Sequence, residues 1–220
     1  LMLSGAAFSV DAAEADAPLQ TFGGGSATDF SYVGSARAFF PAGESTSIFL
    51  GLDYAHGRAS QQVTDPVTAA LAPSLYDGTR SNLYGADLYV KWKPANQAET
   101  YASLAWQTEY FLRHLTGLTL PDGRAVPLEG GLYSQLVAQV QRRLYIGLRG
   151  EVMGLPQGDN VHREYAGALS LTWALSEFAR IRGYGELRET RRVPGEPLHR
   201  SEALFLQLEA AIGAHGAHPF

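Results

Sequence analysis

Histidines are the first side chains in this sequence whose type and spacing suggest chemistry, and His215 and His218 are the only close pair. Their His-x-x-His spacing lies in the terminal segment GAHGAHPF, where an extended or turn-like backbone can bring two imidazoles to one Zn²⁺. Two ligands need a carboxylate or water to complete the coordination. We therefore predict His215 and His218 as candidate zinc ligands, with a structural or assembly role for this segment as the alternative.

The remaining histidines are far apart in the sequence, each near the end of a predicted strand or in a loop: His56, His114, His162 and His199. Two interpretations stay open. Together with Asp159, Glu164 and Glu196 they could form a capture site at the mouth of a barrel, or they are unrelated solvated residues.

Several other chemistries lack the residues they need. The chain contains no cysteine, which excludes disulfides and thiolate metal sites. No nucleophile motif and no glycine-rich phosphate loop occur, so we expect no enzyme; the alternative is a hydrolase with a serine–histidine pair at a barrel rim. A formal net charge of −5 without a basic cluster argues against a nucleic-acid partner.

Charged side chains recur at alternate positions within apolar segments, as residues lining the lumen of a barrel do. The candidates are Arg37, Asp53, Asp87, Lys91, Glu109, Arg113, Arg149, Glu151, Arg180, Arg182, Glu186, Arg188 and Glu209. They could set the selectivity of a pore through the local field, or pair across strands and plug a narrow barrel. The mixture of signs favours pairing, whereas Arg180, Arg182 and Arg188 favour a wall that attracts anions.

These charges must be positioned by strands, because apolar and polar residues alternate with a period of two. The pattern predicts ten strands, at 1–10, 30–40, 48–56, 83–93, 101–113, 132–141, 144–153, 165–173, 178–188 and 202 to about 213. Short and long connections alternate along the chain, as they do in outer-membrane barrels. Residues 1–28 are predicted to be a partial strand and a loop, or the remnant of a signal peptide, and 29–220 the barrel.

The resulting fold class is all-β, an antiparallel up-and-down transmembrane β-barrel, either complete or the carboxy-terminal part of a larger one. No apolar run approaches the roughly 20 residues of a transmembrane helix. A soluble barrel would bury the charged face, at a cost of several kcal/mol per unpaired charge. Aromatic residues near strand ends are typical of interfacial girdles: Phe39, Phe40, Trp92, Tyr165 and Trp173.

Five segments carry a resemblance to one protein family: SNLYGADLYVKWKP (81–94), WQTEYFL (106–112), GLYSQLVAQVQRRLYIGLRG (131–150), SEFARIR (176–182) and GAHGAHPF (213–220). They are similar to the carboxy-terminal part of the bacterial zinc-regulated outer-membrane proteins, often labelled TonB-dependent receptors. The similarity covers roughly residues 45–220.

The resemblance implies a location in the outer membrane of a Gram-negative bacterium and a link to zinc homeostasis. The expected partners are outer-membrane lipid, the barrel-assembly machinery and a small solute or metal ion; Zn is the one metal implied. We therefore expect a porin-like or transporter-like barrel that passes or binds a small solute. The alternative is a non-conducting structural or partner-binding barrel whose lumen is closed by salt bridges.

Overall fold

The structure, a computed structural model, describes residues 1–9, 22, 30–58, 80–96, 101–117, 128–156, 163–191, 197 and 199–210. These residues form strands, and none of them belongs to a helix that could cross a membrane. The strands are β1 (Met2–Ser9), β2 (Phe30–Ala42), β3 (Thr46–Arg58), β4 (Arg80–Trp92), β5 (Ser103–Thr116), β6 (Glu129–Gln141), β7 (Leu144–Leu155), β8 (Arg163–Ala174), β9 (Ala179–Arg191) and β10 (His199–Ala210). The prediction of an all-β fold with ten strands is confirmed.

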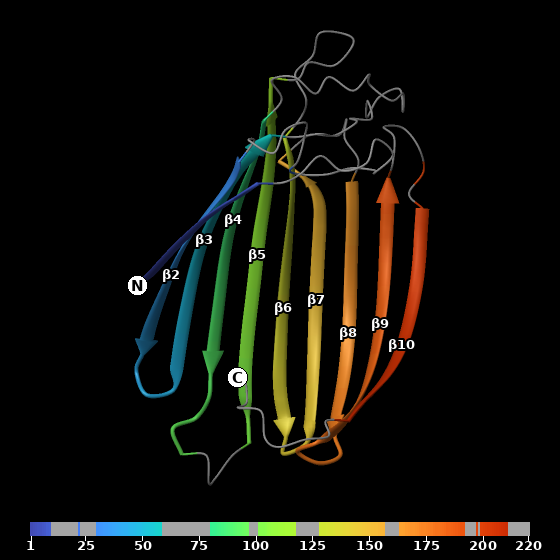
Figure 1. The fold of residues 1–220 in the computed structure, drawn as a ribbon. Helices are drawn as coiled ribbons and strands as arrows, with labels where there is room; N and C mark the ends of the chain where they lie inside the picture. The colour runs from blue at the N-terminus through green and yellow to red at the C-terminus, as the bar shows by residue number, and fades with distance from the viewer. Residues whose placement is uncertain are drawn as a thin grey trace.

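All ten strands belong to one curved sheet, in which each strand pairs antiparallel with its neighbours in the chain (Figure 1). β1 and β10 are its two edges. Within the described residues they do not pair with each other, so the sheet is open and closure into a barrel stays a prediction. The short connections at 43–45, 142–143 and 175–178 lie at one end of the sheet. β1, β3 and β5 end at the other, from which the long connections start.

Tight turns set the register of the hairpins at the first of these ends. Gly43 adopts a φ of 75°, which a residue with a side chain rarely takes, in the connection between β2 and β3. Arg142 and Arg143 alone connect β6 to β7. Because side chains alternate along a strand, each register assigns every residue to one of two faces.

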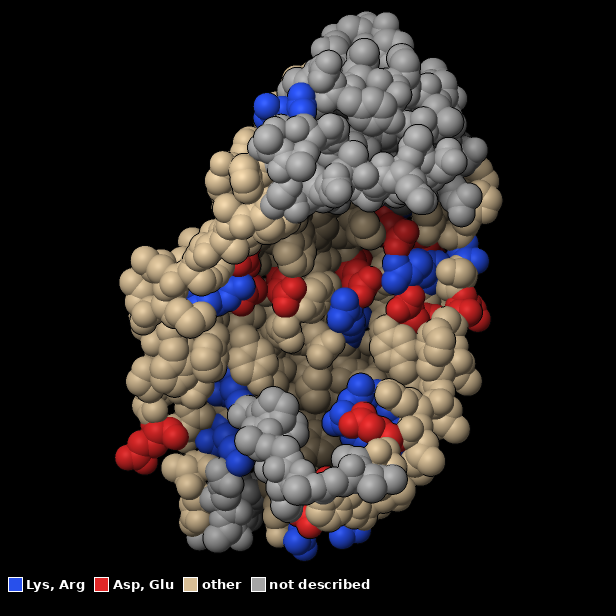
Figure 2. Space-filling model, viewed as in Figure 1, with Lys and Arg blue, Asp and Glu red and all other residues tan. Residues whose placement is uncertain are grey.

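The two faces differ sharply in chemistry. Along β3 and β4 the convex face carries Leu50 opposite Leu88 and Leu52 opposite Ala86, whereas Gly51 opposite Asp87 belongs to the concave face. Acidic and basic side chains gather in the hollow of the molecule (Figure 2). Phe39 departs from the prediction of an interfacial girdle, because its register with Phe49 places it on the same face as Arg37.

Apolar side chains on the convex face are exposed. Leu52, Leu148 and Leu169 are 63%, 55% and 55% exposed, and they lie in the middle of their strands. Among the described residues, Ala55 and Leu115 are the hydrophobic side chains that are buried. The described part of the sheet therefore has no apolar core of its own, and its apolar face is the convex, outward one.

Candidate functional site

The concave face brings together all thirteen charged residues predicted to line a lumen. Residues paired across neighbouring strands lie on the same face of the sheet. One such row runs from Asp87 to Glu109, Tyr133 and Glu151. The same row continues through Ala166 to Arg188. Alternation along each strand then places the other charges on this face.

Arg37 on β2 links the charges of β2, β3 and β4. Its Nη2 donates to both carboxylate oxygens of Asp53 on β3, at 3.0 and 2.9 Å. Its Nη1 lies 3.4 Å from Oδ2 of Asp87 on β4. The two atoms form an ion pair but no hydrogen bond. Oδ2 of Asp87 is buried and has no hydrogen-bond partner. Arg37 thus bridges two carboxylates on two strands.

Gly51 makes this bridge possible. A Cβ at this position would lie 1.8 Å from Oδ2 of Asp87 and 2.5 Å from Nη1 of Arg37. The Arg37–Asp87 pair therefore passes directly over the Gly51 backbone. A side chain at residue 51 would occupy the space that the ion pair needs.

A second group of contacts lies on β5, β6 and β7. Nε2 of Gln107 donates to Oε1 of Glu109 at 2.7 Å and to the hydroxyl of Tyr133 at 2.9 Å. The guanidinium of Arg149 lies over the Tyr133 ring, 4.1 Å from its centroid, in a cation–π arrangement. Nε of Arg149 also pairs with Glu151. Amide, phenol, carboxylate and guanidinium groups are therefore linked across three strands.

Arg188 on β9 forms ion pairs with three carboxylates of the concave face. It contacts Glu164 through Nη1, Glu151 through Nη2 at 3.2 Å and Glu186 through Nε at 2.9 Å. Glu186 also accepts a hydrogen bond from the Tyr184 hydroxyl at 2.7 Å. Since Glu151 is shared with Arg149, this cluster is continuous with the one on β5–β7.

The remaining charges lie toward the two ends of the sheet. Arg180 binds both carboxylate oxygens of Glu209 at 2.7 to 2.9 Å, near the short connections. Arg182 donates to the Thr172 hydroxyl at 3.1 Å. Arg113 pairs with Glu129 at the opposite end, and Lys91 lies on the same face near the end of β4. Two of the three arginines that suggested an anion-attracting wall are thus neutralised by carboxylates.

The sequence alone did not predict the roles of three residues on this face. Glu164, predicted as a possible neighbour of histidines, pairs with Arg188. Gly51 and Tyr133 share the parity of the charged residues, which is the signal that could have found them. Their roles depend on cross-strand register, which the periodicity of a single strand does not reveal.

The predicted histidine sites fall largely outside the residues that the structure describes. His215, His218, His162, Asp159 and Glu196 lie outside the described residues. In the described part of the chain no group of three or more histidine or acidic side chains is arranged to hold a metal ion.

His56 and His114 lie in one row on the convex face, with Asn82 between them on β4. Oδ1 of Asn82 lies 2.9 Å from Nδ1 of His56 and accepts a hydrogen bond from the Tyr54 hydroxyl at 2.9 Å. His199 begins β10. His56 and His114 therefore share one neighbour, Asn82, whose Nδ2 also donates to the carbonyl oxygen of His114, whereas His199 lies on the edge strand.

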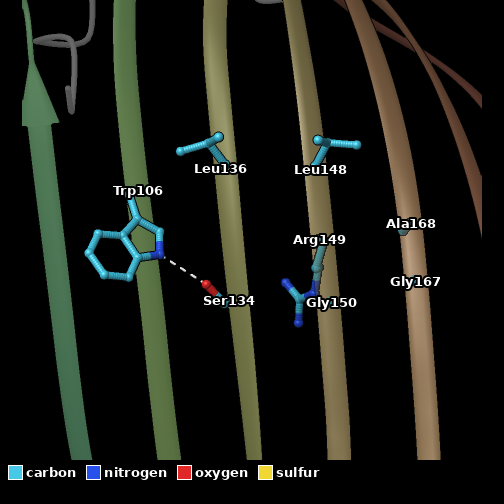
Figure 3. A pocket seen from close by; sticks show the side chains of 8 residues that line it. All are labelled: Trp106, Ser134, Leu136, Leu148, Arg149, Gly150, Gly167 and Ala168. Atoms are coloured by element: carbon cyan, nitrogen blue, oxygen red, sulfur yellow. Dashed lines mark hydrogen bonds between the residues drawn. The ribbon is translucent and has the colours of Figure 1, made fainter.

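A shallow cavity of about 590 Å³ lies against β5–β8 (Figure 3). It contains two of the outward-facing glycines, Gly150 and Gly167, at which a Cβ would meet nothing within 4 Å. Nε1 of Trp106 donates to Oγ of Ser134 at 2.9 Å beside it. These four residues lie on the convex face by register, whereas Arg149, which also lines the cavity, belongs to the concave face. The cavity is therefore a shallow hollow in the apolar surface that reaches one residue of the charged cluster.

No protein-family model, no curated protein and no solved structure matches this chain. The resemblance to the zinc-regulated outer-membrane proteins therefore stays a prediction.

Proposed function

We propose that this chain forms an outer-membrane β-barrel whose concave face lines a passage for a small hydrophilic solute. The observation that carries the proposal is the inverted distribution of side chains: large apolar residues are exposed on the convex face and charges gather in the hollow. In water, exposing that much apolar surface opposes folding. Against lipid the same surface is solvated, and the charged groups keep contact with water inside.

The convex side of β3 and β4 supports a bilayer in more detail. Trp92 lies at one end, Tyr54 opposite Tyr84 near the other, and the rungs between them are aliphatic. Eight residues of strand cover about 26 Å, and a tilt of about 40° reduces this to about 20 Å, near the height of the apolar band of such barrels.

Beyond the tyrosines the rungs become progressively more polar. His56 lies opposite Asn82 on the next rung, and Arg58 lies opposite Arg80 on the rung after that. This order, from aliphatic to aromatic to amide and then to guanidinium, is the order of groups that a chain meets when it passes from hydrocarbon into headgroups.

A bilayer also constrains the two edges of the sheet, because unpaired backbone groups in hydrocarbon cost several kcal/mol each. An even number of antiparallel strands allows β1 and β10 to pair with each other in an up-and-down barrel. Further strands between them would give a wider one. Ten strands give a narrow interior, which polar side chains largely fill.

The concave face presents donors and acceptors of both charges, which suits small polar or ionic solutes. Zinc, or a zinc complex, is one candidate solute, and this choice rests on the family resemblance alone.

The ion pairs favour a second candidate function, a sealed barrel with a structural or partner-binding role. Arg188 engages three carboxylates, and Arg37 engages two. These pairs join neighbouring strands along the wall, and in a narrow barrel such side chains would fill the interior and block passage.

Flotation and conductance together test these proposals. Purified full chain is reconstituted into vesicles, and we expect it to float with the lipid and to raise the conductance of planar bilayers in discrete steps. Flotation with conductance at the level of protein-free bilayers would indicate the sealed barrel. A chain that stays with the soluble fraction would refute the membrane location.

A further inference from the structure

Three aromatic rings lie on the polar face, at the point where β2, β3 and β4 run side by side. Phe39 is registered with Phe49, and Phe49 with Tyr89. Their ring centroids are 4.7 and 6.1 Å apart, with interplanar angles of 49° and 57°. Two strand spacings separate the outer rings, so the row extends about 10 Å across the sheet. We call Phe39, Phe49 and Tyr89 the aromatic row.

Packing does not account for the aromatic row. Phe39 is 50% exposed and Phe49 is 44% exposed, so neither ring is buried in a core. They stand on the face that carries the charges, where a lipid contact is not available under the proposed function. An exposed apolar patch inside a polar surface marks a contact site for a ligand.

Polar groups adjoin the aromatic row on two sides. Across the sheet, Tyr89 is followed in the same row by Gln107 and then Gln135. Along the strands, Arg37 and Asp87 lie two residues from Phe39 and Tyr89, which is about 7 Å toward the long connections. Ring faces, amides, a guanidinium and carboxylates are therefore all within reach of one small ligand.

We propose that the aromatic row is a carbohydrate-binding platform within the passage. A pyranose ring has a face of C–H groups, which pack against the electron-rich face of an aromatic ring. Its rim of hydroxyl groups both donates and accepts hydrogen bonds, and this matches the guanidinium of Arg37, the carboxylate of Asp87 and the amide of Gln107. The inference rests on the proposed function and names its substrate class.

Other ligand classes fit the same surroundings less well. A hydrocarbon would make no use of the neighbouring polar groups, and an inorganic ion would make no use of the rings. An organic cation could bind the rings by cation–π contact, and tetramethylammonium therefore serves as the competing probe in the test.

The chain offers a matched control for testing the platform. Phe40 is adjacent to Phe39 in β2 and is 49% exposed, but it lies on the convex face. Removing either ring takes away a similar exposed surface, and only one of the two rings can contact a solute in the hollow. Phe49→Leu provides a second test, because it keeps an apolar side chain and removes the aromatic face.

The test uses maltotriose as the probe and the full chain in planar bilayers. We expect maltotriose to reduce the ion current through the wild-type protein. Phe39→Ala combined with Phe49→Ala should raise the half-blocking concentration about tenfold, equivalent to about 1.4 kcal/mol, because both ring contacts are lost. Phe49→Leu should show part of the same loss, whereas Phe40→Ala should leave the half-blocking concentration unchanged.

Titration calorimetry of detergent-solubilised protein with maltotriose separates this inference from the passage. Sugar binding without any conductance supports the platform and refutes the passage. Conductance with neither block nor binding heat overturns the platform and leaves the passage intact. An equal loss in Phe40→Ala, or block by tetramethylammonium in place of maltotriose, also overturns the carbohydrate assignment.

Discussion

Substituting Gly51 with alanine tests whether the charges of the concave face are held as described. The new Cβ would lie 1.8 Å from Oδ2 and 2.6 Å from Cγ of Asp87, so the whole carboxylate must move. Nη1 of Arg37, at 2.5 Å, must move as well. Gly51→Ala therefore removes the Arg37–Asp87 ion pair and leaves the buried Oδ2 of Asp87 without its cation.

Two opposing effects determine the size of the change. Displacing the partly buried Asp87 carboxylate from its ion pair costs about 1–3 kcal/mol. Replacing glycine by alanine in a strand contributes about 0.4–1 kcal/mol in the opposite direction, because the unfolded chain loses freedom. We expect a net loss of about 1 kcal/mol in the free energy of unfolding, measured by urea titration of the reconstituted protein.

Gly34→Ala is the control for the glycine effect alone. Gly34 lies on β2, and a Cβ there would meet nothing within 4 Å. This variant should be neutral or slightly stabilised. Combining Gly51→Ala with Asp87→Ala should remove most of the penalty, because the carboxylate that obstructs the new Cβ is gone and Arg37 is free to move aside. A coupling of about 1–2 kcal/mol is expected from the double-mutant cycle. Additive effects, or a Gly51→Ala variant as stable as Gly34→Ala, would refute the reasoning.

Three further predictions address the charge cluster, the convex face and the terminal histidines. Arg188→Gln should lower the free energy of unfolding by about 2 kcal/mol, because three carboxylates lose their shared cation. The control Arg200→Gln, at a side chain that is 57% exposed, should lower it by about 0.5 kcal/mol or less. Equal losses in the two variants would argue against the cluster. Leu148→Arg on the convex face should destabilise the reconstituted protein by about 2–4 kcal/mol relative to Gln135→Arg on the concave face, and similar values for the two variants in urea titration would contradict the lipid contact. If His215 and His218 bind zinc, His215→Ala and His218→Ala should each weaken zinc affinity in titration calorimetry, and unchanged affinity would exclude that role.

The strands could be predicted from the sequence because alternation between two environments is a local property. Each segment carries its own period of two, whatever it pairs with. The observed strands extend beyond several predicted limits, at Arg58, Arg80 and Arg191, because the backbone ladder continues where the apolar alternation has ended. Polar strand ends leave no periodic signal.

The contacts of the site were harder to predict, because they depend on register between strands. Arg188 meets Glu151 and Glu164 only when β7, β8 and β9 are aligned as observed. Phe39 also could not be assigned from its position alone. Its place near a strand end suggested an interfacial ring, whereas its parity with Arg37 assigns it to the polar face. Where the two cues disagree, parity is the stronger one, since it follows from backbone geometry.

The choice between a passage and a sealed interior depends on how the two edges of the sheet are completed. β10 exposes Leu204 and Leu206 at 87% and 81%, the values of an edge strand with a neighbour on one side only. If β1 pairs with it directly, the face that carries Arg37 curves round to meet the face that carries Arg188, and their carboxylate partners fill a narrow interior. If further strands lie between β1 and β10, the same ion pairs line the wall of a wider barrel, and its centre holds water and solute. The aromatic row is useful for binding in the second case and in any incomplete seal of the first, so a sugar-dependent block of current would itself indicate an interior that is open.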